Sequence, residues 1–101
     1  MSDGQFLSTF DETTGVLRVS GDVDEASAVD LRSALTTHSG DPSQGLVVDL
    51  SAVTFLPSLA VGVLARAREE ALGAGVPFEM VASDGSVAQR VLAVCALPYR
   101  S

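Results

Sequence analysis

The segment that most constrains the fold is residues 46–64, which read LVVDLSAVTFLPSLAVGVL. Its apolar start is typical of a buried β-strand. A turn-prone Asp-Leu-Ser triplet at 49–51 interrupts that pattern, and a second apolar stretch follows. Pro57 and Ser58 end the extended character, and from Leu59 onward the residues favour a helix. We therefore predict a strand region that leads into a helix opened by Ser58.

The same segment approaches the length of a membrane-spanning helix. A span would have to bury a proline and several polar groups, namely Asp49, Ser51, Thr54, Pro57 and Ser58. The first ten residues, MSDGQFLSTF, lack the basic and then apolar regions of a secretory signal. We therefore expect a cytoplasmic domain that does not enter a membrane.

The charge balance restricts the partners. The chain has 101 residues, which suits a single domain over 1–101, and a net charge of −7. Its six cationic side chains are all arginine and lie scattered. Nucleic acid and anionic membranes both require a basic surface, so neither is the expected partner. An acidic domain suits a protein partner with a basic face.

The rest of the chain predicts an alternation of strands and helices. We expect strands at 5–10, 16–20 and 78–82, and helices at 25–38, 58–72 and 87–96. Polar residues ending in glycine at 11–15 predict a hairpin loop between the first two strands. The order β-β-α-β-α-β-α indicates an α/β fold with a mixed, largely parallel sheet of about four strands. Helices would pack against that sheet.

The first predicted helix has clear end signals. Asp22 or Asp24 caps its start, because an aspartate side chain accepts from unpaired N–H groups there. One apolar stripe is formed by Ala28, Leu31 and Leu35. His38 and Gly40 are suitable for its last turn and stop, and the turn-rich residues 41–45 link it to the next strand.

Four acidic residues, Asp22, Asp24, Glu25 and Asp49, are a candidate set of oxygen ligands for a metal ion. The alternative is that one of the first two caps the helix and that Asp49 binds backbone in its turn. Aspartate strongly prefers caps and turns. We therefore favour the structural interpretation and expect neither a metal nor a cofactor.

No catalytic constellation emerges from the sequence. A Ser-His-Asp triad would need Ser58 and His38, but His38 ends its helix at the opposite edge of the sheet. Cys95 lies between apolar neighbours in a predicted helix, where we expect it to be inert packing. The glycines at 73 and 75 follow a helix, whereas a phosphate-binding loop opens one. We therefore expect a protein that is not an enzyme.

Two segments resemble the STAS domain, the fold of bacterial anti-sigma-factor antagonists. Residues 20–24, SGDVD, are similar to the glycine, acidic, apolar and aspartate positions before the family's first helix. Residues 48–56, VDLSAVTFL, are similar to the strand that leads to the family's Asp-Ser-Ser-Gly turn. The order of elements agrees over nearly the whole chain. The resemblance implies the STAS fold.

The functional turn departs from the family pattern. The family has aspartate, a phosphorylatable serine, serine or threonine, and glycine, whereas this chain has Pro57, Ser58, Leu59 and Ala60. The resemblance implies that a kinase-type anti-sigma factor binds this domain and phosphorylates Ser58, and that a serine phosphatase reverses the change. It also implies a partner-binding surface, formed by Asp22, Asp24, Pro57, Ser58, Leu59 and Ala60.

The chemistry of Ser58 is compatible with two interpretations. The first turn of a helix has unpaired N–H groups and a positive dipole end, where a phosphate would add about −1.5 to −2 charges. On chemistry alone, Ser58 is an ordinary N-cap. The alternative function is therefore a degenerate STAS module that binds a protein partner or small ligand constitutively. Under either function we expect a monomer or weak dimer.

Overall fold

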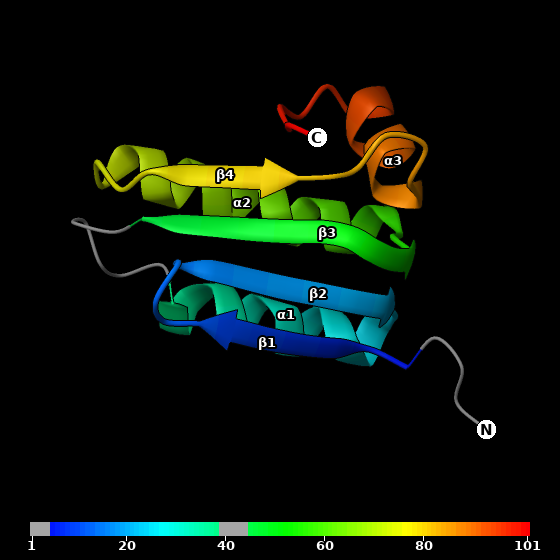
Figure 1. Ribbon diagram of the computed structural model, residues 1–101, viewed down its shortest axis with the longest axis horizontal. Helices are drawn as coiled ribbons and strands as arrows, with labels where there is room; N and C mark the ends of the chain where they lie inside the picture. The colour runs from blue at the N-terminus through cyan, green and yellow to red at the C-terminus, as the bar shows by residue number, and fades with distance from the viewer. Residues whose placement is uncertain (1–4, 39–44) are drawn as a thin grey trace.

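The computed structural model describes residues 5–38 and 45–101, and its centre is a four-stranded sheet in the order β1-β2-β3-β4 (Figure 1). The strands are β1 (Leu7–Asp11), β2 (Val16–Asp22), β3 (Leu46–Phe55) and β4 (Phe78–Val81). β1 and β2 form an antiparallel hairpin, whereas β2 and β4 both run parallel to β3. Parallel neighbours need crossover connections, which helices supply here. The predicted mixed, largely parallel sheet is confirmed.

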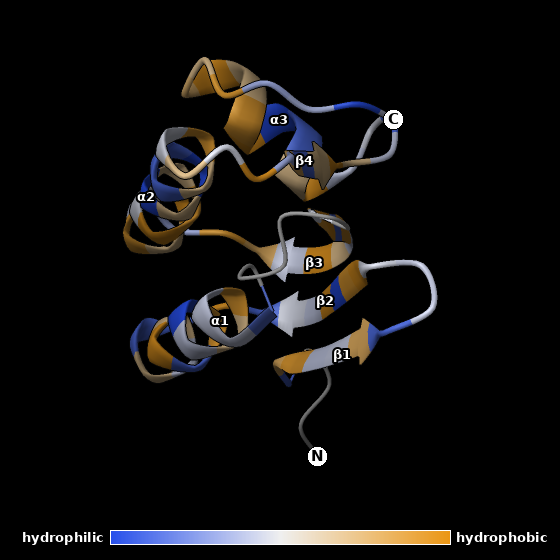
Figure 2. Ribbon diagram, turned by 90° about the vertical axis from the view of Figure 1, so that its left-hand side faces the viewer, coloured by the Kyte–Doolittle hydropathy of each residue, from blue (hydrophilic) through white to orange (hydrophobic). Residues whose placement is uncertain are grey.

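The helices are α1 (Glu25–His38), α2 (Ser58–Gly73) and α3 (Val87–Val94), so the predicted order of elements is also confirmed. α1 and α2 lie side by side on one face of the sheet, and α3 lies beside the carboxyl end of β3 (Figure 1, Figure 2). Within the described ranges, no helix covers the opposite face of the sheet (Figure 2). None of the described helices is both long and apolar enough to span a bilayer.

The hydrophobic core fills the space between the sheet and the two helices. Strand residues that face the helices are buried and alternate with more exposed ones; they include Leu17, Val19, Val48 and Leu50. The predicted stripe of α1 supplies Ala28, Leu31 and Leu35, all at most 2% exposed. Each fully buried leucine stabilises the fold by about 1.5–3 kcal/mol. The core therefore fixes which face of β2 and β3 meets the helices.

The predicted turn at 49–51 is wrong, because β3 is continuous through it. Leu50 is fully buried, so the strand keeps its inward face at this point. Arg18 pairs with Asp49, but Ser20 pairs with Ala52, so β3 carries one extra residue at a bulge. The Asp49 carboxylate accepts a 3.0 Å hydrogen bond from the Ser51 backbone N–H. The polar triplet therefore marks a bulge inside a strand.

Other boundaries differ by a few residues from the prediction. β1 is shifted toward Asp11, and β2 extends to Asp22. α2 is one residue longer than predicted. α3 ends at Val94, and Ala96 shortly after it adopts a φ of 58°, which a right-handed helix does not allow. The predicted stop at Gly40 and most of the link at 41–45 lie outside the described residues.

Candidate functional site

The site predicted from the sequence lies where β3 passes into α2. Leu56 is buried and anchors the end of the strand, and Pro57 follows in an extended conformation as the N-cap of α2. The Pro57 carbonyl accepts hydrogen bonds from the N–H groups of Ala60 at 2.9 Å and Val61 at 3.1 Å. Ser58 is therefore the first helical residue. Its interpretation as an N-cap is wrong, because Pro57 occupies that position without a side-chain cap bond.

Ser58 presents a free hydroxyl at the surface. Its side chain is exposed, and within the described residues it makes no hydrogen bond. Leu59 beside it is 51% exposed, whereas Ala60 is fully buried in the core. Pro57 and Leu59 thus flank Ser58 with apolar surface. Ala60 therefore cannot offer its side chain to a partner.

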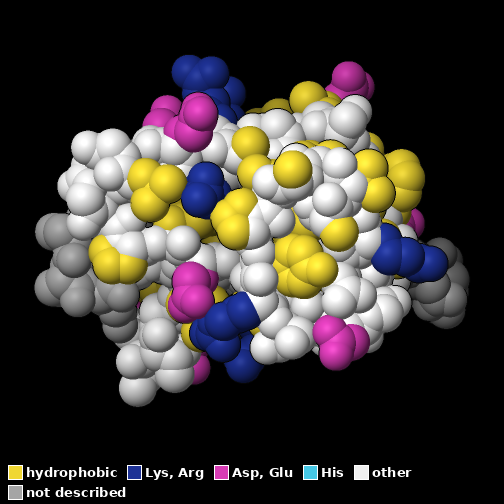
Figure 3. Space-filling view, turned by 90° about the horizontal axis from the view of Figure 1, so that it is seen from above, with side chains coloured by type: hydrophobic (Ala, Val, Ile, Leu, Met, Phe, Trp, Pro, Cys, Tyr) yellow, Lys and Arg dark blue, Asp and Glu magenta, His cyan; other side chains and the backbone are white. Residues whose placement is uncertain are grey.

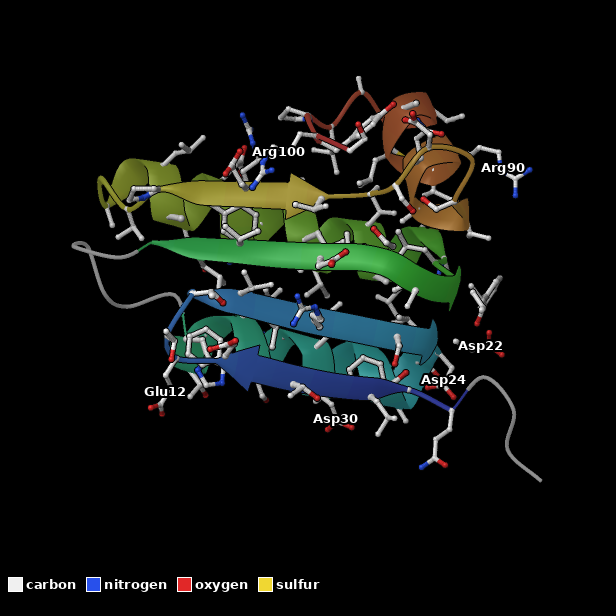
Figure 4. The ribbon with its side chains drawn as sticks, viewed as in Figure 1. Glu12, Asp22, Asp24, Asp30, Arg90 and Arg100 are labelled. Atoms are coloured by element: carbon white, nitrogen blue, oxygen red, sulfur yellow. The ribbon has the colours of Figure 1, made fainter. Side chains whose placement is uncertain are left out.

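The end of β2 is tied to the end of β3. The Thr54 hydroxyl donates a short hydrogen bond to the Asp22 carboxylate, and the Val23 N–H donates to the Phe55 carbonyl at 2.9 Å. These bonds hold Asp22 at the carboxyl edge of the sheet, the edge where α1 and α2 both begin (Figure 4). The structure therefore places Asp22 and Ser58 at the same edge of the sheet.

Asp24, rather than Asp22, caps α1. Its carboxylate accepts hydrogen bonds from the Ser27 N–H and the Ser27 hydroxyl, both at 2.8 Å. The Ser27 hydroxyl oxygen in turn accepts the Asp24 N–H at 2.7 Å. The hydrogen bonds from the Ser27 backbone and hydroxyl hold the pKa of Asp24 below its ordinary value. This reciprocal cap gives Asp24 a structural role at the start of α1.

Three of the four acidic residues that the sequence offered as metal ligands have different partners. Asp22 is bound by Thr54 and Asp24 by Ser27, whereas Asp49 lies in the sheet with its carboxylate 3.8 Å from the Arg18 guanidinium. Among the described residues, no three metal-ligating side chains gather. Asp24 caps α1 and Asp49 accepts from the Ser51 backbone N–H, in agreement with the favoured interpretation, whereas Asp22 binds the Thr54 side chain.

The catalytic triad does not assemble. His38 ends α1, where its ring stacks on Phe10 with centroids 4.0 Å apart. α1 has 14 residues, which is about 21 Å of helix, and both helices begin at the same edge of the sheet (Figure 1). His38 and Ser58 are therefore at opposite ends of the helical layer, as the sequence predicted.

Cys95 is exposed, so its prediction as inert helical packing is wrong. It is the C-cap of α3, one residue beyond the last helical position. Ala88 and Leu92 are the buried residues of that helix. Apolar side chains gather over α3 in the view from above, and Val94 is 85% exposed (Figure 3). Ala96 takes a positive φ without glycine, so the residue type at this position gave no sign that the helix ends before it.

Sequence reasoning missed two residues of this edge, Thr54 and Phe55. Thr54 supplies the hydroxyl that binds Asp22, and Phe55 leaves 53% of its surface exposed. Strand alternation predicts the opposite for Phe55, because Val53 is buried and a residue two positions later should face the same side. The register between β2 and β3 shifts between Gly21 and Asp22, and Leu56 is buried in place of Phe55. Its exposure adds an aromatic group to the surface near Ser58.

These features define a class: a small α/β domain with an exposed serine at the start of a helix and, in its described part, no gathered catalytic or metal-binding groups. The comparison with protein families agrees with that class. The STAS domain model matches residues 6–97, and the chain belongs to the STAS domain family.

Two curated relatives are the anti-sigma-F factor antagonists RsfB of Mycobacterium tuberculosis strains CDC 1551 / Oshkosh and ATCC 25618 / H37Rv. Each is 41% identical over 75 residues, which is 74% of this chain. The chain spans 60% of the length of these relatives.

Two solved structures resemble this one closely in fold. An anti-sigma factor antagonist from Mycobacterium paratuberculosis has a TM-score of 0.74 at 29% identity, over 95% of this chain and 84% of that one. The anti-sigma factor antagonist SpoIIAA in its unphosphorylated form has a TM-score of 0.69 at 16% identity, over 96% and 86%. The second likeness concerns the fold alone.

Proposed function

We propose that this domain is an anti-sigma-factor antagonist that binds a kinase-type anti-sigma factor and is released when Ser58 is phosphorylated. The observation that carries the proposal is the exposed, unbonded hydroxyl of Ser58 at the first position of α2. The names of the M. tuberculosis relatives support the class of partner. The proposed partner surface comprises Asp22, Phe55, Ser58 and Leu59, which are exposed, and the half-buried Pro57 between them.

The chemical step is an ordinary phosphoryl transfer. The Ser58 hydroxyl oxygen attacks the γ-phosphorus of ATP held by the partner kinase, ADP leaves, and the serine proton passes to a base on the kinase. An exposed hydroxyl with no competing hydrogen bond meets the access that this attack requires. A serine phosphatase would hydrolyse the phosphoserine and restore the hydroxyl.

The surroundings of Ser58 explain how phosphate would end the complex. Pro57 and Leu59 make the local surface apolar, and a buried interface there would have to desolvate the added charge of about −1.5 to −2. The free domain tolerates the same charge easily. Pro57 offers no side-chain cap, so N–H groups of the first turn of α2 remain available to the phosphate oxygens. Phosphorylation therefore favours the free state over the complex.

A second candidate function is a constitutive binding module. It is favoured by Pro57, which removes an acidic group from the position before the serine, and by Leu59, whose 51% exposure suits a permanent apolar contact. In that case the charge state of residue 58 has little influence on binding. Ser58→Ala and Ser58→Asp would then both bind the partner within a few-fold of the unchanged domain.

The test incubates the domain with a kinase-type anti-sigma factor and Mg-ATP, and locates the phosphate by mass spectrometry. The M. tuberculosis anti-sigma-F factor is one suitable probe. We expect a single phosphate on Ser58 and none on the Ser58→Ala variant. Ser58→Asp should lower the affinity for the anti-sigma factor at least about tenfold, whereas Ser58→Ala should preserve it. An unmodified Ser58, under conditions that phosphorylate a homologue with the intact motif, would overturn the switch.

A further inference from the structure

A surface groove of about 570 Å³ runs between α1 and α2. Its lining includes Arg32 from α1, and Leu59, Gly62, Val63, Arg66 and Ala67 from α2. Figure 2 shows the two helices side by side, on the same face of the sheet. Leu59 lines the groove and also belongs to the proposed partner surface. The groove is therefore continuous with the surface around Ser58.

Gly62 is anomalous within this groove. It is the fifth residue of α2, where glycine weakens a helix relative to alanine. Its φ is not positive, and a Cβ added to it would meet no atom within 4 Å. The described part of the chain therefore gives no reason for a glycine at this position. Close approach by a molecule from outside would give one, since glycine exposes the helix backbone.

The groove also carries a net positive charge on a strongly acidic protein. It is lined by two arginines, Arg32 and Arg66, and by one acidic residue, Glu70, in a chain whose net charge is −7. The described residues give Arg32 no acidic partner. Arg66 lies 3.6 Å from Glu70, but both side chains are more than two-thirds exposed, and such a pair is weak and readily exchanged. Both arginines are thus available to carboxylates of a partner.

We propose that this groove binds an amphipathic helix of a partner protein, whose apolar stripe is flanked by aspartate or glutamate. The apolar stripe would lie over Val63 and Ala67 and approach the backbone at Gly62, while the flanking carboxylates pair with Arg32 and Arg66. From Leu59 to Glu70 the groove side of α2 is about 16 Å long, which is about three helical turns. The inference rests on the proposed function only in assigning this helix to the anti-sigma factor.

The first test uses two synthetic helical peptides with the same leucine stripe, one flanked by glutamate and the other by lysine. Binding is followed through backbone amide shifts in NMR spectra of the ¹⁵N-labelled domain. We expect the glutamate peptide to shift the amides of Arg32, Gly62, Val63 and Arg66, and to bind at least about tenfold more tightly than the lysine peptide. Equal affinities, or shifts confined to another surface, would overturn the proposal.

The second test separates binding from stability. Gly62→Ala should raise Tm by about 2–8 °C, because it removes a glycine from a helix interior. It should nevertheless lower the affinity for the glutamate peptide at least about fivefold, since the new methyl group keeps the peptide from approaching the α2 backbone closely. Gly73→Ala is the matched control, because Gly73 lies in the same helix, outside the groove, and a Cβ there also meets nothing within 4 Å. It should leave peptide affinity unchanged.

A charge reversal completes the design. Arg32→Glu should lower the affinity for the glutamate peptide at least about tenfold, whereas Arg90→Glu on α3 should leave that affinity unchanged. If the anti-sigma factor binds the domain but ignores Gly62→Ala and Arg32→Glu, the groove assignment fails and the proposed function stands. If the peptide binds in the groove while no anti-sigma factor binds the domain, the proposed function fails and the groove stands.

Discussion

Thr54 donates a side-chain hydrogen bond to Asp22 across 32 positions of sequence, and this bond joins the carboxyl ends of β2 and β3. The adjacent backbone bond from the Val23 N–H to the Phe55 carbonyl, at 2.9 Å, reinforces the junction. α1 begins just after the first of these strand ends, and α2 just after the second. The Thr54–Asp22 bond therefore helps to fix the start of α1 relative to Ser58 at the start of α2.

Removing the Thr54 hydroxyl should loosen this junction. We expect Thr54→Val to lower the free energy of unfolding by about 0.5–1.5 kcal/mol, the usual contribution of one hydrogen bond. Urea denaturation of Thr54→Val, Asp22→Ala and the double variant gives their coupling energy. Thr9→Val is the control, because Thr9 is an exposed strand residue whose side chain makes no hydrogen bond to the part of the chain that the structure describes. A coupling energy near zero would show that the bond does not stabilise the fold.

The sequence predicted the features that depend on local patterns. The bounds of α1 and its buried stripe follow from caps and a 3.6-residue period, and the position of Ser58 at the start of α2 follows from the proline before it. The continuity of β3 through Asp49 could not be predicted in this way. The extra residue there is defined against its pairing partner in β2, which lies about thirty residues earlier.

The same distinction applies to the candidate site. Asp22 and Asp24 are equivalent cap candidates by residue type, and only the reciprocal contact with Ser27 identifies Asp24 as the cap. Thr54 carries no local sign of its partner, since the bond to Asp22 forms only after β2 and β3 pair. The groove beside Leu59 depends on the packing of α1 against α2, which no single helix pattern contains.

Gly45 should tolerate no side chain. Its φ is +73°, and a Cβ there would lie 2.7 Å from the Pro77 carbonyl oxygen, which is held by the Leu46 N–H at 2.9 Å. Gly45→Ala combines backbone strain with a clash against fixed backbone, so we expect it to cost about 2–4 kcal/mol. Gly75→Ala has a similar φ of +75° but open space, and should cost only about 1–2 kcal/mol. Equal losses in urea denaturation would contradict the clash.

The cap at Asp24 predicts a pH dependence. The pKa of Asp24 is lowered in the fold from an ordinary value of 3.8, so the folded protein binds this proton less readily than the unfolded chain. The charged carboxylate therefore contributes stability above the unfolded pKa, and this contribution is lost as the pH falls through the folded pKa.

We expect Asp24→Asn to have a lower urea midpoint than the unchanged domain at neutral pH, because asparagine keeps the cap but loses the charge. The difference should shrink as the pH falls below about 3.8. Asp30→Asn, on an exposed position of the same helix, is the control. A difference between Asp24→Asn and the unchanged domain that persists at pH 2 would rule out the carboxylate charge as its source.

Cys95 should react with a thiol reagent in the folded state. It is exposed at the C-cap of α3, and the chain contains one cysteine, so one equivalent of Ellman's reagent should be consumed without denaturant. Labelling should leave the unfolding midpoint within error, because Ala88 and Leu92 rather than Cys95 pack α3 against the core. Reaction that occurs only after urea is added would show that the thiol is buried.

Negative charge at residue 58 should stabilise the free domain. α2 has no acidic residue in its first turn and no side-chain cap, so its positive end is uncompensated. We expect Ser58→Asp to raise the free energy of unfolding by about 0.3–1 kcal/mol at low salt, and the gain to shrink at high salt because the site is exposed. Ser58→Ala should be nearly neutral, since the Ser58 hydroxyl makes no bond within the described residues.

The comparison of stability with affinity separates the two candidate functions. Under the switch, Ser58→Asp is the more stable protein and the weaker binder of the anti-sigma factor, so its reduced affinity cannot be attributed to unfolding. Under constitutive binding, it gains the same stability and keeps its affinity. Urea denaturation in 20 mM and 500 mM salt, with calorimetric titration of the same samples, measures both quantities. A Ser58→Asp domain less stable than Ser58→Ala would contradict the exposed, uncompensated helix start from which both expectations derive.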